Sequence, residues 1–136
     1  MAYLLDTDIL IDQFAELPAA VELVGRLASA GIAVSIITYM EAYQGVLRSP
    51  DRQIAEAKFT DFMASVPVLP FSPSVARRCA ELREDLRLGG KRVRARALDL
   101  LTAAIALEHQ LTLVTRNSAD YHDIPDLDLY PSNELW

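Results

Sequence analysis

Short apolar runs alternate along this chain with longer segments of helical periodicity, and this alternation restricts the fold more than any other feature. Residues 3–5, 32–36 and 111–115 are such runs, and residues 66–70 form a weaker one because prolines cannot donate to a sheet ladder. Strands that alternate with helices form βαβ units, in which the strands are parallel and the crossovers right-handed. The sequence therefore predicts one α/β domain over residues 1–136, built on a parallel sheet.

The predicted helices have recognisable starts and ends. Thr7 or Asp8 is expected to cap a helix that begins near Ile9, and Pro18 and Gly31 are expected to open and end the next one. The remaining predicted elements are a helix from residue 38 to the break at 49–51, helices over 52–65, 73–88 and 98–110, and a last short strand over 127–129.

Composition limits the class of protein. With 51% hydrophobic and 24% charged residues, the chain has the balance of a globular domain. No apolar run reaches the roughly 18 to 20 residues that span a bilayer, so we expect no membrane segment and a cytoplasmic location. Cys79 is alone and permits no disulfide framework, and His109 and His122 lack the spacing of a zinc site.

Basic residues are concentrated in one stretch of an acidic chain. The net charge is −6, yet eight of the 13 basic residues lie between Arg77 and Arg96. Such a stripe either steers a polyanion to one face or is simply a solvated surface, and charge alone does not separate the two. The candidate residues for contact with a polyanion are Lys91, Arg92, Arg94, Arg96 and Arg116.

Carboxylates follow the predicted strands. Asp6 ends the first strand, Glu41 lies early in the helix after the second, Asp99 starts the alanine-rich helix, and Asp120 follows the strand after that helix. The carboxyl ends of parallel strands meet at one edge, where open α/β sheets bind ligands. Each acid also has an ordinary explanation: Glu41 can complete a capping box with Thr38, and Asp99 can interact with its helix dipole.

Two other acids near the start of the chain are expected to have structural roles. Asp8 is better explained as an N-cap, and Asp12, one helical turn further on, is expected to face solvent.

A cluster of strand-end carboxylates requires a compensating charge. Two carboxylates about 4 Å apart repel by about 4 kcal/mol at an effective dielectric near 20, so three or four of them need protons or cations between them. Hard cations such as Mg²⁺ and Mn²⁺ select oxygen ligands, and Mg²⁺ also engages phosphates. The chemistry indicated is metal-assisted displacement at phosphorus.

Four motifs, in this order, resemble those of the PIN-domain ribonucleases, and more narrowly the VapC toxins of bacterial toxin–antitoxin pairs. They are Leu-Leu-Asp6-Thr7-Asp8, Glu41 in the helix after the second strand, Asp99-Leu-Leu-x-Ala-Ala-x-Ala, and Leu-Val-Thr115-Arg116-Asn117-x-x-Asp120-Tyr121. The resemblance covers essentially the full chain. It implies a three-layer PIN-like fold, with a central, mostly parallel sheet of four to five strands and helices on both faces.

The resemblance also implies a site and an activity. Asp6, Glu41 and Asp99 would bind Mg²⁺, for which Mn²⁺ can substitute, and Asp120 would complete an acidic quartet. Thr7 would hydrogen-bond within the site. Asn117 would be a polar neighbour that orients a ligand or water, and because some members carry an aspartate there, Asn117 and Asp120 both stay open as the fourth ligand.

The implied function is a metal-dependent endoribonuclease toxin that hydrolyses RNA to a 5′-phosphate and a 3′-hydroxyl, with a cognate VapB-type antitoxin and a second copy of the chain as partners. Arg96, in a stretch more basic than in many relatives, would join the RNA-facing stripe or lie against the carboxylates. The apolar side chains of one helix either form an antitoxin groove or belong to the core, and spacing favours the core; they are Tyr39, Tyr43, Val46 and Leu47.

Two other functions remain open from the sequence. One is a PIN-like module that binds RNA or protein without catalysis, against which the three acids argue. The other is a phosphatase of the haloacid dehalogenase type, whose Asp-x-Asp also follows a first strand. The chain has Leu10 where that family expects threonine or valine, and its only lysines are Lys58 and Lys91.

Overall fold

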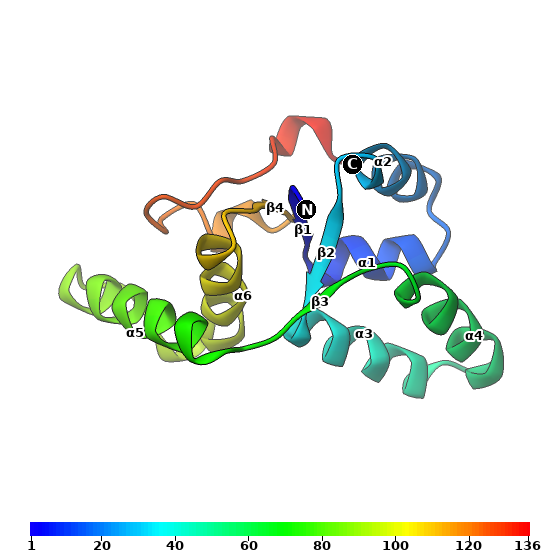
Figure 1. Cartoon of the computed structure of the whole chain (residues 1–136), viewed down its shortest axis with the longest axis horizontal. Coiled ribbons are helices and arrows are strands. Elements are labelled where there is room, and N and C mark those ends of the chain that lie inside the picture. The colour runs from blue at the N-terminus through cyan, green and yellow to red at the C-terminus, as the bar shows by residue number, and fades with distance from the viewer.

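A computed structural model describes the chain from Met1 to Trp136. Its strands are β1 (Tyr3–Leu5), β2 (Ile32–Ser35), β3 (Val68–Leu69) and β4 (Thr112–Val114). They form one four-stranded parallel sheet in the order β3-β2-β1-β4, so β1 lies inside the sheet between β2 and β4 (Figure 1). All crossovers between these strands carry helices, as the alternation in the sequence predicts.

Helices cover both faces of this sheet. Figure 1 shows α5 and α6 on one side and α1 to α4 on the other. Their bounds are α1 Thr7–Phe14, α2 Pro18–Ala28, α3 Ile36–Arg48, α4 Arg52–Met63, α5 Pro73–Leu88 and α6 Ala97–Glu108, with short 3₁₀ turns η1 Arg94–Arg96, η2 Ser118–Asp120 and η3 Ser132–Glu134. The three-layer α/β prediction is confirmed.

Alternate residues of β1 enter two separate cores. Leu4, with Ala33 and Leu113 on the neighbouring strands, packs into the core of α5 and α6. Leu5, with Val34 and Val114 opposite it, packs into the core of α1 to α4. This is the period-two pattern of a strand buried on both faces, and it leaves only the strand ends free for polar residues.

Two predicted helix starts are wrong. The N-cap of α1 is Asp6 itself, whose carboxylate accepts from the Thr7 amide at 2.8 Å, rather than Thr7 or Asp8. The helix after β2 begins at Ile36 instead of residue 38, because the Ser35 hydroxyl accepts from the Thr38 amide at 3.0 Å and caps it. Strand and helix therefore meet without a loop at both places, and the capping side chains lie on the last residues before the helices.

The end of the predicted sheet is shorter than expected. Residues 127–129 do not form a strand: Leu129 makes a single parallel bridge to Leu113, flanked by hydrogen bonds from the Leu113 amide to Asp128 and from the Tyr130 amide to Leu113.

The apolar stripe of α3 belongs mostly to the core. Tyr39 and Tyr43 pack edge-on against Phe59, with ring centroids 5.0 and 5.2 Å apart, and Val46 is buried. Leu47 is 43% exposed. None of the helices is both long enough and apolar enough to cross a membrane.

Candidate active site

Asp6 is fixed at the point where β1 becomes α1. Its backbone is extended, its amide donates to the Val114 carbonyl of β4 at 2.9 Å, and its carboxylate accepts from the Thr7 amide. The side chain is only 9% exposed. Burial raises the pKa of Asp6 to about 6, against the opposing effect of the Thr7 amide. Asp6 is therefore a buried carboxylate, and no lysine or arginine side chain forms an ion pair with it.

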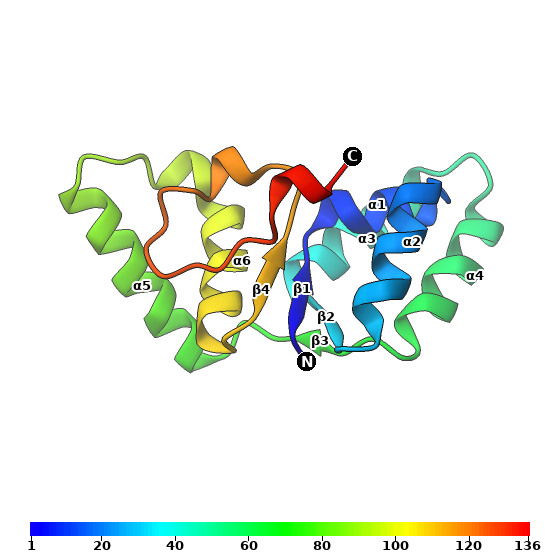
Figure 2. The same cartoon turned by 90° about the horizontal axis from the view of Figure 1, so that it is seen from above.

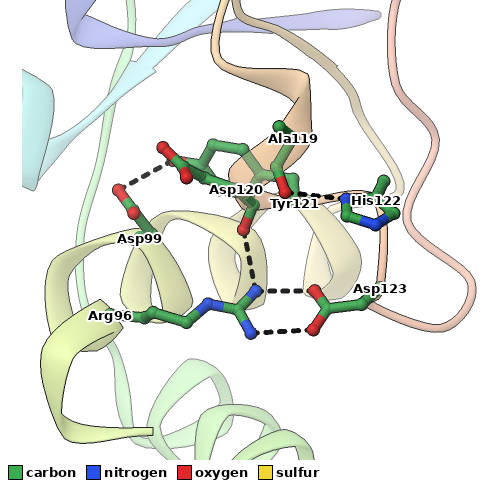
Figure 3. A network of polar contacts seen from close by, with 7 residues as sticks. All are labelled: Arg96, Asp99, Ala119, Asp120, Tyr121, His122 and Asp123. Atoms are coloured by element: carbon green, nitrogen blue, oxygen red, sulfur yellow. Dashed lines mark hydrogen bonds and ion pairs between the residues drawn. The ribbon is translucent and has the colours of Figure 1, made fainter. Parts of the chain in front are cut away.

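Asp99 approaches Asp6 from the first turn of α6. The Tyr121 hydroxyl lies 3.2 Å from Asp6 Oδ2 and 3.2 Å from Asp99 Oδ1, so one phenol bridges the two carboxylates. Figure 3 shows the Asp99 side of this contact. Burial and the two carboxylates raise the pKa of Tyr121, which keeps its proton available for donation. The hydroxyl proton of Tyr121 can be donated to only one of the two carboxylates at a time. Burial raises the pKa of Asp99 as well as that of Asp6.

Glu41 reaches the same edge from α3. The Thr7 hydroxyl donates to Glu41 Oε1 at 2.6 Å and lies 3.1 Å from the Thr38 hydroxyl. The capping box predicted for Thr38 and Glu41 is therefore wrong: Glu41 uses a side chain of α1 rather than backbone amides, and its charge contributes to the raised pKa of Asp99. Thr7 and Glu41 thus tie α1 to α3 beside the two aspartates.

Asp120 lies on the turn η2, and Arg96 holds that turn in place. Arg96 donates to the Asp120 carbonyl at 2.7 Å and binds both oxygens of Asp123, at 2.7 and 2.9 Å (Figure 3). Arg96 and Asp123 are each 17% exposed, and the guanidinium keeps the pKa of Asp123 low. The charge of Asp120 contributes to the raised pKa of Asp99. Asn117, at the start of the same turn, makes no capping hydrogen bond with its side chain. Arg96 is thus a structural residue at the edge of the cluster.

A second network fixes the loop after β4 from the other side. The Arg116 amide donates to Asp8 at 2.8 Å, and its guanidinium binds Asp12 at 2.8 Å and lies 5.8 Å from the ring centroid of Trp136. The Trp136 indole N–H donates to Asp12 at 2.9 Å. Asp8 is therefore not an N-cap, Asp12 does not simply face solvent, and Arg116 is not free for RNA. The Asp12–Trp136 contact joins residues 124 positions apart, which local sequence does not reveal.

The predicted basic stripe divides into two groups. Arg96 and Arg116 are taken up by the ion pairs above. Lys91, Arg92 and Arg94 are exposed and belong to no ion pair.

The acids suit a hard cation by their chemistry. The candidate ligands are the carboxylate oxygens of the four acids and the amide oxygen of Asn117, and Asp6 and Asp99 share one hydrogen-bond donor although burial raises the pKa of both. No three carboxylate, imidazole or thiol side chains lie close enough together to enclose a metal ion. By the chemistry of its donors the set fits Mg²⁺ or Mn²⁺ in kind, with Asp6 and Asp99 joined by the Tyr121 hydroxyl and Glu41 bound by Thr7.

Tyr121 is the candidate site residue that sequence reasoning missed. It follows Asp120 in the motif Asn117-x-x-Asp120-Tyr121, but an aromatic residue there is explained equally well as core. Its ring is indeed buried in the α5–α6 core, at 1% exposure, and only the hydroxyl reaches the acids. Its position directly after a candidate acid was the one available signal.

Comparisons with known proteins give a family model and relatives that extend over most of this chain. A family model described as PIN domain matches residues 3–126. A protein named ribonuclease VapC2 from Rickettsia felis is 30% identical over 95% of this chain and 96% of its own length. Another, named tRNA(fMet)-specific endonuclease VapC, from Shigella flexneri, is 26% identical over 93% of this chain and 95% of its own.

Solved structures of the same group share the fold. VapBC2 from Rickettsia felis, bound to a DNA fragment from its promoter, superposes with a TM-score of 0.84 at 29% identity, covering 96% of this chain and 98% of that one. DNA-bound VapBC from Salmonella typhimurium gives the same TM-score at 24% identity, covering 96% and 97%, and at that identity the likeness concerns the fold alone.

Proposed function

Because this chain belongs to the PIN-domain family, we propose that it is a metal-dependent endoribonuclease, a toxin that hydrolyses RNA phosphodiester bonds and is neutralised by a cognate antitoxin. The observation that carries the catalytic part is the meeting of Asp6 and Asp99 at the Tyr121 hydroxyl. The relatives named ribonuclease and tRNA(fMet)-specific endonuclease support RNA as the substrate.

The ion proposed for this site is Mg²⁺, or Mn²⁺ in its place. Asp6 and Asp99 would hold it, with Glu41 and Asp120 as the further acids of the edge. Such a cation, when bound, supplies positive charge for a phosphodiester displacement and lowers the pKa of water. Asp6 is the strongest candidate ligand, because its buried carboxylate gains most from a compensating charge.

The chain's own residues set the geometry in which this chemistry would occur. Tyr121 holds Asp6 and Asp99 toward the same point, and it is the only hydroxyl that contacts both. Thr7 fixes Glu41 beside them, and Arg96 holds the carbonyl of Asp120. Each acid is therefore held by a residue that is not itself a candidate ligand, which is the arrangement that keeps a site preorganised.

The test is cleavage of RNA with product ends defined. Total RNA incubated with the chain and Mg²⁺ should gain new 5′-phosphate ends beside 3′-hydroxyls, and excess EDTA should abolish them. Asp6→Asn should lose this activity while remaining folded. Asp61→Asn, an exposed position on α4, is the matched control and should cleave normally. Cleavage that persists in EDTA, or in Asp6→Asn, would contradict the proposal.

A binding module without catalysis is the alternative. The observation in its favour is that no three candidate ligands are close enough to enclose an ion. Calorimetry separates the two: the nuclease should bind Mn²⁺, and Asp6→Asn should bind it much more weakly, whereas a pure module should bind no metal.

The proposed antitoxin requires an exposed apolar surface, and the side of the molecule formed by α1, α3 and α4 has one. A hollow of about 300 Å³ there is lined by Ile11, Val46 and Ile54, of which Ile11 and Ile54 are 51% and 56% exposed. Size-exclusion chromatography with the product of the neighbouring reading frame should give a stable complex, and Ile54→Glu should weaken it. Unchanged elution in the presence of that product would argue against the pairing.

A further inference from the structure

A groove of about 1040 Å³ runs between α5 and the segment that leads into α6. On the α5 side its floor is Ala76, Cys79 and Ala80, which lie at i, i+3 and i+4 on one face of that helix. Val93 and Leu101 form part of the opposite wall. The floor is open to solvent in part, since Ala80 is exposed and Ala76 half-buried, whereas Cys79 is buried.

Cations line this groove with little acid to neutralise them. Arg83, Lys91, Arg92 and Arg94 belong to no ion pair. Glu84 is the only acid of the lining, and both of its oxygens are bound by Arg87, at 2.7 and 2.8 Å. The groove therefore presents four uncompensated positive charges, on a chain whose net charge is −6.

One aromatic side chain lies at the start of the same groove. Phe71, just before α5, is 41% exposed although it is a large apolar residue. Lys91, Arg92 and Arg94 follow the other end of α5, whose 16 residues span ~24 Å. A groove with an exposed aromatic residue at one end and uncompensated cations at the other suits a single-stranded nucleic acid that runs along it, where bases stack and phosphates pair.

The groove adjoins the acidic edge. The connection over residues 89–96 lies at the same end of the molecule as the carboxyl ends of β1 and β4 (Figure 2). Leu101, which lines the groove, is two residues from Asp99, so the two side chains point to opposite sides of α6, a helix ~10 Å across. The link between groove and acids is the turn before α6, where Arg94 lines the groove and Arg96 donates to the Asp120 carbonyl. A strand that passes the acids can enter the groove across this turn.

We propose that this α5–α6 groove is an RNA-binding site, which holds unpaired nucleotides flanking the bond to be cut, with a base on Phe71 and phosphates on Lys91, Arg92 and Arg94. The inference rests on the proposed function for its substrate. RNA is a better occupant than an acidic protein segment, because the cations extend toward the acidic edge, where the phosphodiester has to lie. For a protein segment we would expect them to surround a closed apolar hollow instead.

The test measures RNA binding without cleavage, in the Asp6→Asn background. The probe is a fluorescein-labelled, unstructured RNA of about 15 nucleotides. Replacing Lys91, Arg92 and Arg94 together by glutamine should lower the slope of log affinity against log salt by about 2, since each phosphate contact to a single strand contributes about 0.7. Phe71→Ala should weaken binding about tenfold with the slope unchanged, because a stacked base contributes about 1–3 kcal/mol and 1.4 kcal/mol is tenfold.

The matched control is Arg77→Gln, an exposed arginine of α5 that does not line the groove and should change neither quantity. Affinity and salt slope equal to those of the parent in both groove variants would overturn the inference. So would unchanged RNA binding with lost antitoxin binding, since the occupant would then be a protein segment. If the wild-type chain does not cut RNA, the proposed function is contradicted but the RNA-binding site is not, because the binding measurements do not depend on cleavage.

Discussion

Ionisation of Asp6 should destabilise the metal-free chain, and Asp6→Asn should remove this effect. The carboxylate is 9% exposed, and burial raises its pKa to about 6 from the ordinary value near 4. The folded state therefore binds a proton more tightly than the unfolded chain does. Between about pH 4 and pH 6 the native state holds more protons at this residue, so its contribution to stability falls as pH rises.

The magnitude follows from the two pKa values. A carboxyl whose pKa rises from about 4 to about 6 on folding destabilises the folded state by about 3 kcal/mol once it is ionised, at 1.36 kcal/mol for each pKa unit. The effect is absent below pH 4 and complete above about pH 6. Asparagine has the same shape and no charge, so the free energy of unfolding of Asp6→Asn should gain about 3 kcal/mol relative to wild type between pH 4 and pH 7.

The assay is urea denaturation of both chains in EDTA at several pH values, with the difference between them taken at each pH. The difference isolates Asp6, because other acids such as Asp123, whose pKa Arg96 holds low, titrate in both chains. Excess Mg²⁺ at pH 7 should then stabilise wild type by about 2.7 kcal/mol at a hundred times its Kd and leave Asp6→Asn almost unchanged.

Two results would refute the reasoning. If wild type and Asp6→Asn stay parallel from pH 4 to pH 7, the Asp6 carboxylate is not desolvated in the folded chain. If Mg²⁺ stabilises both equally, a bound ion does not use Asp6, and the proposed catalytic role of this residue fails even where RNA cleavage is observed.

Four further substitutions test how the edge and its scaffold are held. Tyr121→Phe should lower the unfolding free energy of the metal-free chain at pH 7 by about 1.5–3 kcal/mol in urea denaturation, because a buried donor to a carboxylate is lost. Arg96→Gln should lower the free energy of unfolding by about 1–3 kcal/mol at pH 7, because the ion pair with Asp123 is lost. The difference in unfolding free energy between wild type and this variant should decrease below about pH 4, since the lowered pKa of Asp123 means that its stabilising contribution is lost as it gains a proton. Gly31→Ala should lower the thermal midpoint, because Gly31 has φ +98° and its Cβ would lie 2.8 Å from the Cα of the first residue. Gly25→Ala, in α2 with nothing within 4 Å, should raise it.

The sequence was sufficient for the layout of the fold and the place of the acids. Strands buried on both faces are apolar along their length, so a polar residue that closes such a run marks the strand end, as Asp6 does after β1. The order of four motifs then indicated the PIN family, which the match over residues 3–126 confirms.

Local sequence could not show which groups the polar side chains bind. Thr38 and Glu41 have capping-box spacing, yet the Ser35 hydroxyl caps the helix by accepting from the Thr38 amide. The Glu41 carboxylate accepts instead from the hydroxyl of Thr7, 34 positions away. The packing of α1 against α3 places the Thr7 hydroxyl against Glu41, and local spacing does not show this. The Tyr121 bridge to Asp6 spans 115 positions and has no local signature at all.

The same contacts decide which of Asn117 and Asp120 is the better candidate for a fourth ligand. The loop after β4 is held at both ends by residues outside the acid cluster, with Arg116 bound by Asp8 and Asp12, and the Asp120 carbonyl bound by Arg96. Between these ends the Asn117 side chain makes no hydrogen bond. The carboxylate of Asp120, in contrast, lies near enough to contribute to the raised pKa of Asp99, and this repulsion is what a shared cation would relieve. Asp120 is therefore a better candidate than Asn117 for a fourth ligand of the proposed cation.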